Sequence, residues 1–236
     1  MQELILYDGF VSKSVAESKW TIASAPLGDG AFWYWKDDNA AVEAGGGYAT
    51  IRIPRFSLSH DQVQIFDNPK HLYLATRSWE TAGGPLAFKT KLAGECTGDP
   101  EDYRDGFASF TVLDFERAMV FDIVTNGHHV WAIYERLLIP GLTIPEQAFT
   151  EVVDLGVPTE PMKEHEIEIA FDAASARASF SVDGAVRLTR DNVPAIPRQL
   201  TCGFGLITLR PIENGKSVSC LGQGGTCKLG AVWVRG

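Results

Sequence analysis

Residues 118–136 read AMVFDIVTNGHHVWAIYER, and this stretch decides the fold class. Two apolar runs rich in β-branched and aromatic residues flank Asn126-Gly127, which is the strongest local signal for a hairpin with a two-residue type I′ turn. Such a turn would place Asp122 directly opposite Trp131 across the strand pair. The stretch therefore predicts an antiparallel β-hairpin with a defined register.

The two faces of this predicted hairpin differ in character, because successive side chains of a strand point to opposite faces. The face expected to meet the core carries Met119, Phe121, Ile123, Val130, Ala132 and Tyr134. The opposite face carries Asp122, His129, Trp131 and Glu135. An aromatic ring among ionisable groups on the open face of a sheet is a candidate ligand surface.

Short strands separated by Gly, Pro, Asn and Asp are predicted along the rest of the chain. Besides the hairpin runs 117–125 and 128–138, the expected strands are 3–7, 31–35, 47–53, 71–79, 86–92, 107–113, 165–171, 177–182, 185–189, 202–209 and 230–235. Short turns of helix are expected only at 14–20 and 144–149, and 93–106 and 211–229 are expected to be long loops. This pattern favours an all-β fold, a two-sheet antiparallel β-sandwich. Since no linker or repeat is visible, residues 1–236 are expected to form a single domain.

Composition narrows the possible partners. The formal net charge is −9, and nucleic-acid binding normally needs a basic patch, so no nucleic-acid partner is expected. No window approaches the ~18 apolar residues that a membrane span requires, and the first ten residues lack the features of a signal peptide. We therefore expect a cytoplasmic protein without a membrane partner, and the oligomeric state stays open.

The chain contains four cysteines, Cys96, Cys202, Cys220 and Cys227. Reduced thiols are the expected state, although the spacing leaves open a Cys220–Cys227 bridge across a Gly-rich turn. Neither a Cys-x-x-Cys pair nor a Cys/His cluster occurs, so no structural zinc is predicted.

Three further features carry motifs. LYDGF at 6–10, followed by Lys19-Trp20, has the form of a first strand with its Trp, and SFSVDG at 179–184 has the form of a strand that ends in an Asp-Gly hairpin turn. CGFGLITL at 202–209 and LGAVWV at 229–234 have the form of two closing strands. Together they resemble the concanavalin A-like jelly roll, the fold of legume lectins, many glucanases and laminin-G modules. No specific family within that superfamily is indicated.

The resemblance implies a concave, ligand-binding sheet that contains the hairpin 118–136. Glucanases of this fold carry Glu-x-Asp-x-x-Glu on one strand, whereas the matching strand here offers only Asp122. In the predicted register Glu135 lies four residues along the sheet from Asp122, which is roughly 13 Å. Cooperating glycosidase carboxylates need about 5–9.5 Å, so a glucanase-type retaining mechanism is not expected. Lectins of this fold often bind calcium through acidic loops, but 98–106 lacks EF-hand spacing and is expected to be solvated.

The candidate catalytic residues are Asp122, His129 and Glu135. Asp122 and His129 would lie diagonally across the hairpin, with Cβ atoms about 7–8 Å apart, and an Asp that orients a His makes a general base near neutral pH. The alternative is a surface or half-buried pair without a catalytic role. Glu135 is either a second acid or the partner of an Arg on a neighbouring strand.

The candidate ligand-binding residues surround this face. Trp131 is expected to stack on a sugar or an apolar ligand, or to cover a hydrophobic groove. Ser109 and Thr111 would add neutral donors beside Asp122 if their face of strand 107–113 is the groove face. The remaining candidates are Tyr73, Arg77 and Trp79, which share a face by period-two counting, and Arg104, which could clamp a carboxylate or phosphate. At least two rings of the aromatic run 32–35 are expected in the core or groove.

Two functions compete on this reading. The first is a cofactor-independent acid–base enzyme acting on a small organic or sugar-like metabolite, by isomerisation, elimination, cyclisation or hydrolysis. The second is a non-catalytic carbohydrate-binding module, and glycoside hydrolysis stays open by analogy of fold alone. The sequence contains no nucleophile elbow, phosphate loop, dinucleotide fingerprint or His-Glu-x-x-His, so no cofactor is expected.

Overall fold

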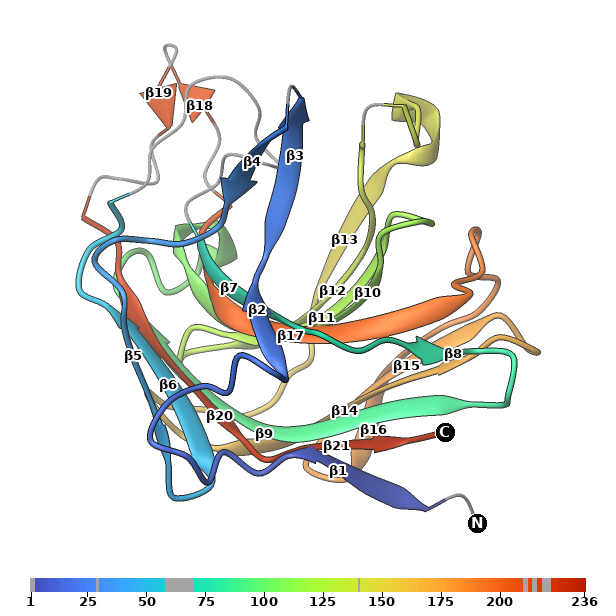
Figure 1. The fold of residues 1–236 in the computed structure, drawn as a ribbon, viewed down its shortest axis with the longest axis horizontal. Helices are drawn as coiled ribbons and strands as arrows, with labels where there is room; N and C mark the ends of the chain where they lie inside the picture. The colour runs from blue at the N-terminus through green and yellow to red at the C-terminus, as the bar shows by residue number, and fades with distance from the viewer. Residues whose placement is uncertain are drawn as a thin grey trace.

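Two antiparallel sheets lie face to face in the computed structural model (Figure 1). The structure describes residues 3–28, 30–57, 70–139, 141–209, 212–213, 216–217 and 222–236. This architecture confirms the predicted all-β sandwich. Within these residues, no helix is both long and apolar enough to cross a lipid bilayer.

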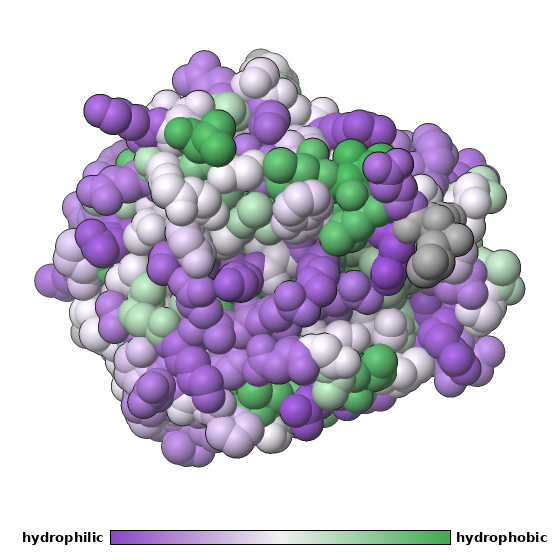
Figure 2. Space-filling model, turned by 90° about the horizontal axis from the view of Figure 1, so that it is seen from below, coloured by the Kyte–Doolittle hydropathy of each residue, from purple (hydrophilic) through white to green (hydrophobic). Residues whose placement is uncertain are grey.

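The outer sheet has nine strands. Its main path runs through β16 (Ala185–Arg190), β15 (Arg177–Val182), β14 (His165–Asp172), β9 (Leu86–Cys96), β20 (Gly225–Gly230), β6 (Tyr48–Ile53) and β5 (Ala41–Gly45). β21 (Val232–Arg235) pairs with β9 and with β1 (Leu4–Asp8). Its outer surface, seen in Figure 2, is mainly hydrophilic. Ion pairs such as Lys89–Glu166, 2.7 Å apart, contribute to that surface.

The second sheet has eight strands, and we call it the concave sheet. Its path is β13 (Phe149–Asp154), β12 (Val130–Arg136), β11 (Met119–Thr125), β10 (Phe107–Asp114), β17 (Gln199–Ile207), β7 (Lys70–Ala75) and β2 (Trp20–Ile22), and β8 (Trp79–Glu80) pairs with β17. As the resemblance implied, the 118–136 hairpin lies in this sheet. A separate hairpin, β3 (Ser24–Gly28) with β4 (Ala31–Tyr34), rises above it on one side, and β13 rises on the other (Figure 1).

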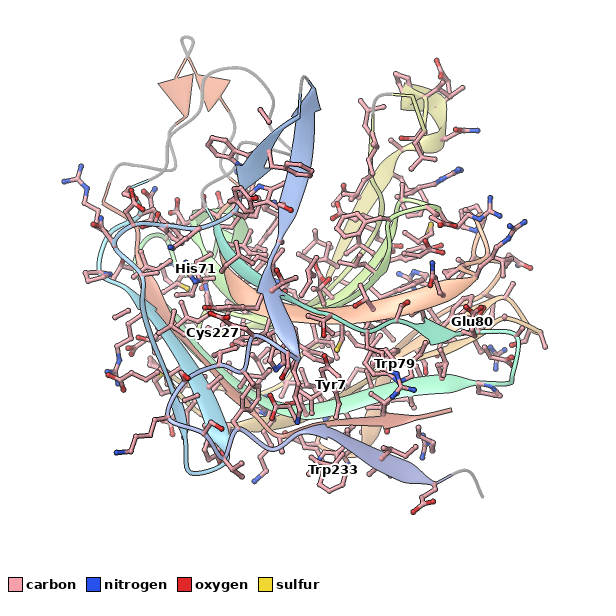
Figure 3. All side chains as sticks on the ribbon, viewed as in Figure 1. Tyr7, His71, Trp79, Glu80, Cys227 and Trp233 are labelled. Carbon is pink, nitrogen blue, oxygen red and sulfur yellow. The ribbon has the colours of Figure 1, made fainter. Side chains whose placement is uncertain are left out.

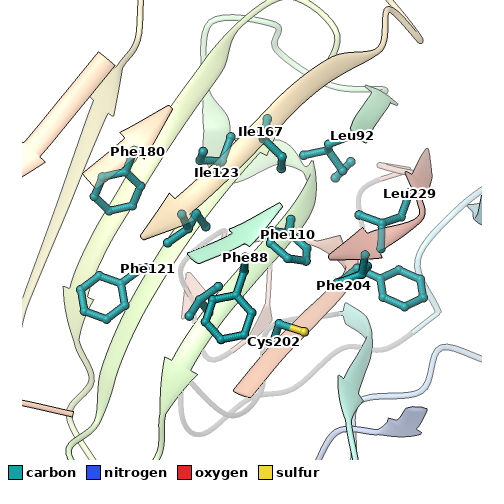
Figure 4. Close-up of a cluster of buried hydrophobic side chains, with 14 of the residues drawn as sticks. Phe88, Leu92, Phe110, Phe121, Ile123, Ile167, Phe180, Cys202, Phe204 and Leu229 are labelled. Atoms are coloured by element: carbon teal, nitrogen blue, oxygen red, sulfur yellow. The ribbon is translucent and has the colours of Figure 1, made fainter. Parts of the chain in front are cut away.

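The core lies between the two sheets and is rich in phenylalanine (Figure 4). The six core-facing residues predicted for the hairpin all belong to it. Fully buried members from other strands include Phe88, Phe110, Ile167, Phe180, Phe204 and Leu229. In β14 the buried residues alternate with more exposed ones, so this strand has one face on the core and one toward solvent, as its sequence predicts.

The Asn126-Gly127 turn differs from the prediction. Thr125 pairs with Val130, so the connection has four residues and the register is displaced by two. The Asn126 side chain causes this: it is buried, its Oδ1 accepts from the backbone N–H groups of His128 and His129, and its Nδ2 donates to the Pro100 carbonyl. Since side chains alternate with period two, a displacement of two keeps every residue on its predicted face.

Other local predictions fail where tertiary contacts decide the backbone. Residues 14–20 form a turn and the start of β2 instead of helix, whereas 144–149 contains a short 3₁₀ helix, Pro145–Gln147. The predicted strand 71–79 is broken after Ala75, since Thr76 donates its N–H to the Lys19 carbonyl. Strands β2, β3, β5 and β13 were not predicted. The expected loop 211–229 contains β18 (Ile212–Glu213), β19 (Lys216–Ser217) and most of β20, and the expected loop 93–106 begins within β9.

The described cysteines Cys96, Cys202 and Cys227 are free thiols. Burial raises the pKa of the Cys227 thiol to about 12, so it stays protonated and unreactive at neutral pH. Cys220 lies outside the described residues.

Candidate active site

The concave sheet brings a carboxylate pair to the middle of its open face. Asp122 on β11 lies between Thr111 on β10 and Ile133 on β12, each directly opposite it. Glu135 lies opposite Val120, two residues along the sheet from the partner of Asp122. Asp122 and Glu135 are therefore diagonal neighbours, with Cβ atoms about 7–8 Å apart or somewhat less.

A pocket lies against this pair, and its space amounts to about 740 Å³ when the open solvent at its mouth is included. Its walls combine residues of the concave sheet with the segment before β5 and the segment after β12. The lining residues are Trp35, Lys70, Leu72, Phe107, Thr111, Leu113, Phe115, Val120, Asp122, Ile133, Glu135, Leu137, Ile139, Ile207 and Leu209. The carboxylates thus face an enclosed and mostly apolar space.

Asp122 is a strongly perturbed carboxyl group in this pocket. It is only 7% exposed, and its Oδ1 has no hydrogen-bond partner among the described residues. Burial raises its pKa to about 8, and the Thr111 hydroxyl only partly offsets this rise. Glu135 raises the pKa of Asp122 further, and the Lys70 ammonium lowers it. Asp122 is therefore mostly a neutral acid at pH 7, able to donate a proton into the pocket.

The Glu135 carboxylate has a hydrogen-bond donor that favours its charged form, unlike the Oδ1 atom of Asp122. Burial raises its pKa too, but the Thr150 hydroxyl donates to its Oε2 at 2.9 Å, and Lys70 also favours the carboxylate. Two carboxyl groups in one pocket therefore have different surroundings, which is the usual way to assign one as acid and the other as base.

The predicted separation of about 13 Å between the Asp122 and Glu135 positions was wrong. The four-residue connection moves Glu135 two residues closer along the sheet. A diagonal Cβ separation of about 7–8 Å is compatible with the separation of about 5–9.5 Å between carboxyl groups that glycosidases use. The observed register, displaced by two residues from the predicted one, therefore brings the two carboxyl groups close enough to act on one substrate.

The predicted Asp122–His129 pair does not form. His129 lies in the four-residue connection, where its Nδ1 is 2.6 Å from Asp154 Oδ2 and its Nε2 is 3.3 Å from Glu101 Oε2. Partial burial lowers the pKa of His129, but these two carboxylates raise it overall. His129 is therefore a partner of the 101 loop and β13, away from Asp122.

Trp131 is not an open stacking platform. The His129 ring stacks on it with centroids 5.0 Å apart and an interplanar angle of 21°, and the Tyr103 ring lies 6.3 Å away. Only 6% of Trp131 is exposed. Its part in the concave face is structural cover, which was one of the two roles considered for it.

Of the two hydroxyl residues predicted beside Asp122, Thr111 lines the pocket and Ser109 does not. Ser109 shares the face of Thr111 but lies opposite Val124, nearer Trp131, and is fully buried. Its Oγ has no hydrogen-bond partner among the described residues.

The other predicted ligand residues lie outside the pocket. Tyr73 faces the core, where it stacks on Phe204 with centroids 5.4 Å apart. Trp79 also turns inward and contacts Tyr7 (Figure 3), and the Arg77 guanidinium lies 5.3 Å from the Trp79 ring. The placement of Tyr73 follows from β7, whose Leu72 and Leu74 take the concave face instead, whereas Arg77 and Trp79 lie beyond the end of that strand.

Arg104 is also remote from the carboxylate pair. It lies in the 3₁₀ helix Tyr103–Asp105 and pairs with Asp102 at 2.8 Å. The N–H groups of the Arg104 guanidinium therefore donate to the neighbouring Asp102 carboxylate.

Sequence reasoning missed Lys70 and placed Trp35 only loosely. The Lys70 ammonium lies 5.3 Å from the centroid of the Trp35 ring, and both residues line the pocket. Alternation along β7 could have found Lys70, because it shares a face with Leu72. In the aromatic run 32–35, Phe32 and Tyr34 are exposed, so the run divides between two sides as expected.

The described residues contain no group of three or more His, Cys, Asp and Glu side chains arranged to hold a metal ion. Of the described residues in the pocket, the groups with chemistry are two carboxyls, one ammonium and one hydroxyl. This set can perform proton transfer.

Fold and site together define a concanavalin A-like jelly roll with a carboxylate pair on its concave sheet. One solved structure that shares the fold is an endo-1,3-β-glucanase from Streptomyces sioyaensis, with a TM-score of 0.61 and 16% sequence identity, covering 100% of this chain and 95% of that chain. Another is the catalytic domain of a laminarinase from Thermotoga petrophila, with a TM-score of 0.59 and 12% identity, covering 100% of this chain and 99% of that chain. A third is a κ-carrageenase from Pseudoalteromonas carrageenovora bound to an oligotetrasaccharide, with a TM-score of 0.61 and 13% identity, covering 99% of this chain and 95% of that chain.

The family itself is settled by a family model that matches residues 7–236. This chain belongs to DUF6081, a family of unknown function. No curated protein matches it. The identities of 12–16% to the three solved structures establish the fold and nothing about the reaction.

Proposed function

We propose that this protein is a cofactor-independent acid–base enzyme that acts on a small organic molecule bound in the concave pocket. The observation that supports this most directly is the diagonal pair of Asp122 and Glu135 in one enclosed apolar site. Buried ionisable groups with perturbed pKa values in a cleft are typical of functional sites.

The two carboxyl groups would divide the work. Asp122, neutral at pH 7 because its pKa is about 8, donates a proton to an oxygen of the substrate. Glu135, whose charged form Thr150 and Lys70 favour, removes a proton from carbon or from water on the same substrate. Each turnover returns both groups to their starting protonation through the product or solvent. Isomerisation, elimination, cyclisation and hydrolysis all satisfy this proton balance.

Glycoside hydrolysis is the second candidate, and two observations favour it. The diagonal placement of Asp122 and Glu135 is compatible with a glycosidase pair, and solved structures that share the fold include a glucanase, a laminarinase and a carrageenase. The Glu-x-Asp-x-x-Glu strand of such glucanases is replaced here by Phe121-Asp122-Ile123 and its neighbours. We do not propose a purely carbohydrate-binding role, because His129 covers the ring of Trp131.

The test is a turnover screen with matched variants. Purified protein would be incubated with β-1,3-glucan and κ-carrageenan oligosaccharides and with a panel of ketones, epoxides and ketals, and products followed by mass spectrometry. For any substrate found, Asp122→Asn and Glu135→Gln should each reduce kcat/KM by about 100-fold or more. His129→Gln, which alters an ionisable residue outside the pocket, should stay within about twofold of wild type. Full activity in both carboxyl variants would refute the proposal.

A further inference from the structure

The lining of the pocket is poorly suited to a sugar. Of the described residues that line it, all but Lys70, Thr111, Asp122 and Glu135 are apolar, and most of those are aliphatic. A bound saccharide would lose water from several hydroxyl groups per ring, and each would need a new hydrogen-bond partner. The four polar side chains come from β7, β10, β11 and β12 of the concave sheet, which forms the floor of the pocket. The walls above this floor therefore offer few hydrogen-bond partners to a sugar.

The apolar character is a property of the whole concave face. A second buried cluster, separate from the core between the sheets, includes Trp35, Leu113, Val120 and Ile133. Trp131 belongs to the same cluster and lies under His129. The face on which a jelly roll could bind a ligand is therefore built here as a second hydrophobic surface.

One polar atom in the floor indicates what the ligand must supply. Asp122 lines the pocket and is only 7% exposed. Its Oδ1 atom has no hydrogen-bond partner among the described residues. As a neutral acid at pH 7, Asp122 offers an O–H donor there. The complementary ligand atom is a hydrogen-bond acceptor, and a carbonyl, ether or epoxide oxygen supplies one without adding a further donor that the apolar lining would leave unpaired.

The charges in the pocket favour an uncharged ligand. The Lys70 ammonium opposes the binding of a cation, and a carboxylate at Glu135, which the same ammonium favours, would oppose the binding of an anion. With Asp122 neutral, the charges of Lys70 and of such a carboxylate would balance.

We infer that the pocket binds an uncharged, mainly hydrocarbon molecule that presents a carbonyl, ether or epoxide oxygen to Asp122. This inference rests on the proposed function, which places the reaction in this pocket, and it adds the chemical class of the substrate. It commits the site to apolar oxygenated metabolites in preference to oligosaccharides.

The experiment measures binding, which does not require turnover. Nile red, an uncharged apolar dye with a carbonyl group, serves as the fluorescent probe, and four competitors displace it: cyclododecanone, cyclododecane, dodecylamine and laminaritriose. We expect micromolar binding of Nile red and displacement by cyclododecanone at concentrations at least tenfold below those needed for cyclododecane or dodecylamine. Laminaritriose should not displace the dye at millimolar concentration.

Two variants locate the effect. Asp122→Leu should remove the tenfold preference for cyclododecanone over cyclododecane, because the donor is lost, whereas Asp122→Asn keeps an N–H donor and should keep most of it. His129→Gln is the matched control and should bind as wild type does. Circular dichroism and thermal melting would show that each variant is folded.

Three outcomes would overturn the inference: no binding of Nile red, equal displacement by the ketone and the hydrocarbon, or displacement by laminaritriose at the concentration of cyclododecanone. The proposed function fails separately, when Asp122→Asn and Glu135→Gln leave turnover unchanged. A ketone preference that depends on Asp122, found without any effect of these variants on turnover, would retain the ligand class and reject the enzyme.

Discussion

Asp122 and Glu135 stand diagonally across the β11–β12 strand pair, each beside a threonine hydroxyl, Thr111 in one case and Thr150 in the other. The two carboxyl groups differ in their surroundings: Asp122 is buried, with an oxygen that has no hydrogen-bond partner in the described part of the chain, and Glu135 accepts from Thr150. This asymmetry makes the pair chemically unequal. The predictions below follow from it and from the contacts that position it.

The stability of the protein should fall as pH rises through the range in which Asp122 ionises. Its pKa is about 8 in the folded protein and about 3.9 in an unfolded chain, so the folded state holds more protons between these values. The free energy of unfolding therefore decreases from about pH 4 to about pH 8, by on the order of 5 kcal/mol from this group alone. Denaturant unfolding at pH 5, 7 and 9 measures the change.

Asp122→Asn provides the matched comparison, since it keeps the shape and cannot ionise. Its free energy of unfolding should depend less on pH, and it should exceed that of wild type above pH 8. Equal pH dependence in the two proteins would show that Asp122 is not the buried acid described here.

For any substrate whose oxygen Asp122 protonates, kcat/KM should decline above about pH 8. The acid must be protonated in the free enzyme, and its pKa is about 8; the rate then falls about tenfold for each further pH unit. A pH–rate profile between pH 6 and 10 tests this. A flat profile across that range would assign the proton transfer to another group.

His129 should matter for stability at low pH and not for catalysis. Asp154 and Glu101 raise its pKa above the ordinary value, so the stabilisation is full below about pH 6.5 and is lost as pH rises through the higher folded value. His129→Gln should therefore lower stability at pH 5.5 by no more than about 1 kcal/mol, and by less at pH 9. Melting temperatures of wild type and His129→Gln at both pH values measure this difference. A larger loss of stability at pH 9 than at pH 5.5 would contradict the prediction.

Asn126→Ala should destabilise the protein by about 3 kcal/mol. The change removes the acceptor for the N–H groups of His128 and His129 and the donor to the Pro100 carbonyl, all at a buried position. Asn126→Asp keeps the acceptor and loses only the donor, so it should cost less. Urea unfolding of the three proteins gives the order, and an alanine variant as stable as the aspartate variant would contradict it.

Gly205→Ala should destabilise the concave sheet by about 2 kcal/mol. A Cβ at Gly205 would lie 2.3 Å from the His71 carbonyl oxygen and 3.0 Å from Leu72 Cα, both on the backbone of β7. Gly83→Ala is the control: a Cβ there meets nothing within 4 Å and should change stability by about 0.5 kcal/mol or less. Equal melting temperatures for the two variants would mean that β17 and β7 can separate without cost.

Periodicity alone predicted which residues of the 118–136 hairpin face the core. Every one of the six, from Met119 to Tyr134, is buried between the sheets, because alternation is a local property of extended backbone. The same alternation placed Asp122, Trp131 and Glu135 together on the other face. Asp122 and Glu135 stayed on one face despite the error of two residues in register, for the same reason, although the sequence had placed them too far apart to cooperate.

Distances and partners could not be predicted in this way. The register depended on the buried side chain of Asn126, whose Nδ2 donates to Pro100 from a loop 26 residues earlier. The loss of His129 from the site depended on Asp154 and Glu101, which come from two other parts of the chain. Tyr73 turned toward the core because β7 gave Leu72 and Leu74 to the concave face, and Trp79 lies in a separate strand, β8, beyond the break after Ala75.

The sequence by itself determined the all-β class, the hairpin and the faces of its strands, because strand propensity and alternation act between residues that are neighbours in the chain. Only the tertiary structure decided that Asp122 meets Glu135 instead of His129, that Lys70 and Trp35 join them, and that the surrounding pocket is apolar. Those contacts join strands far apart in sequence, and their energies depend on burial, which exists only once the sheets have packed.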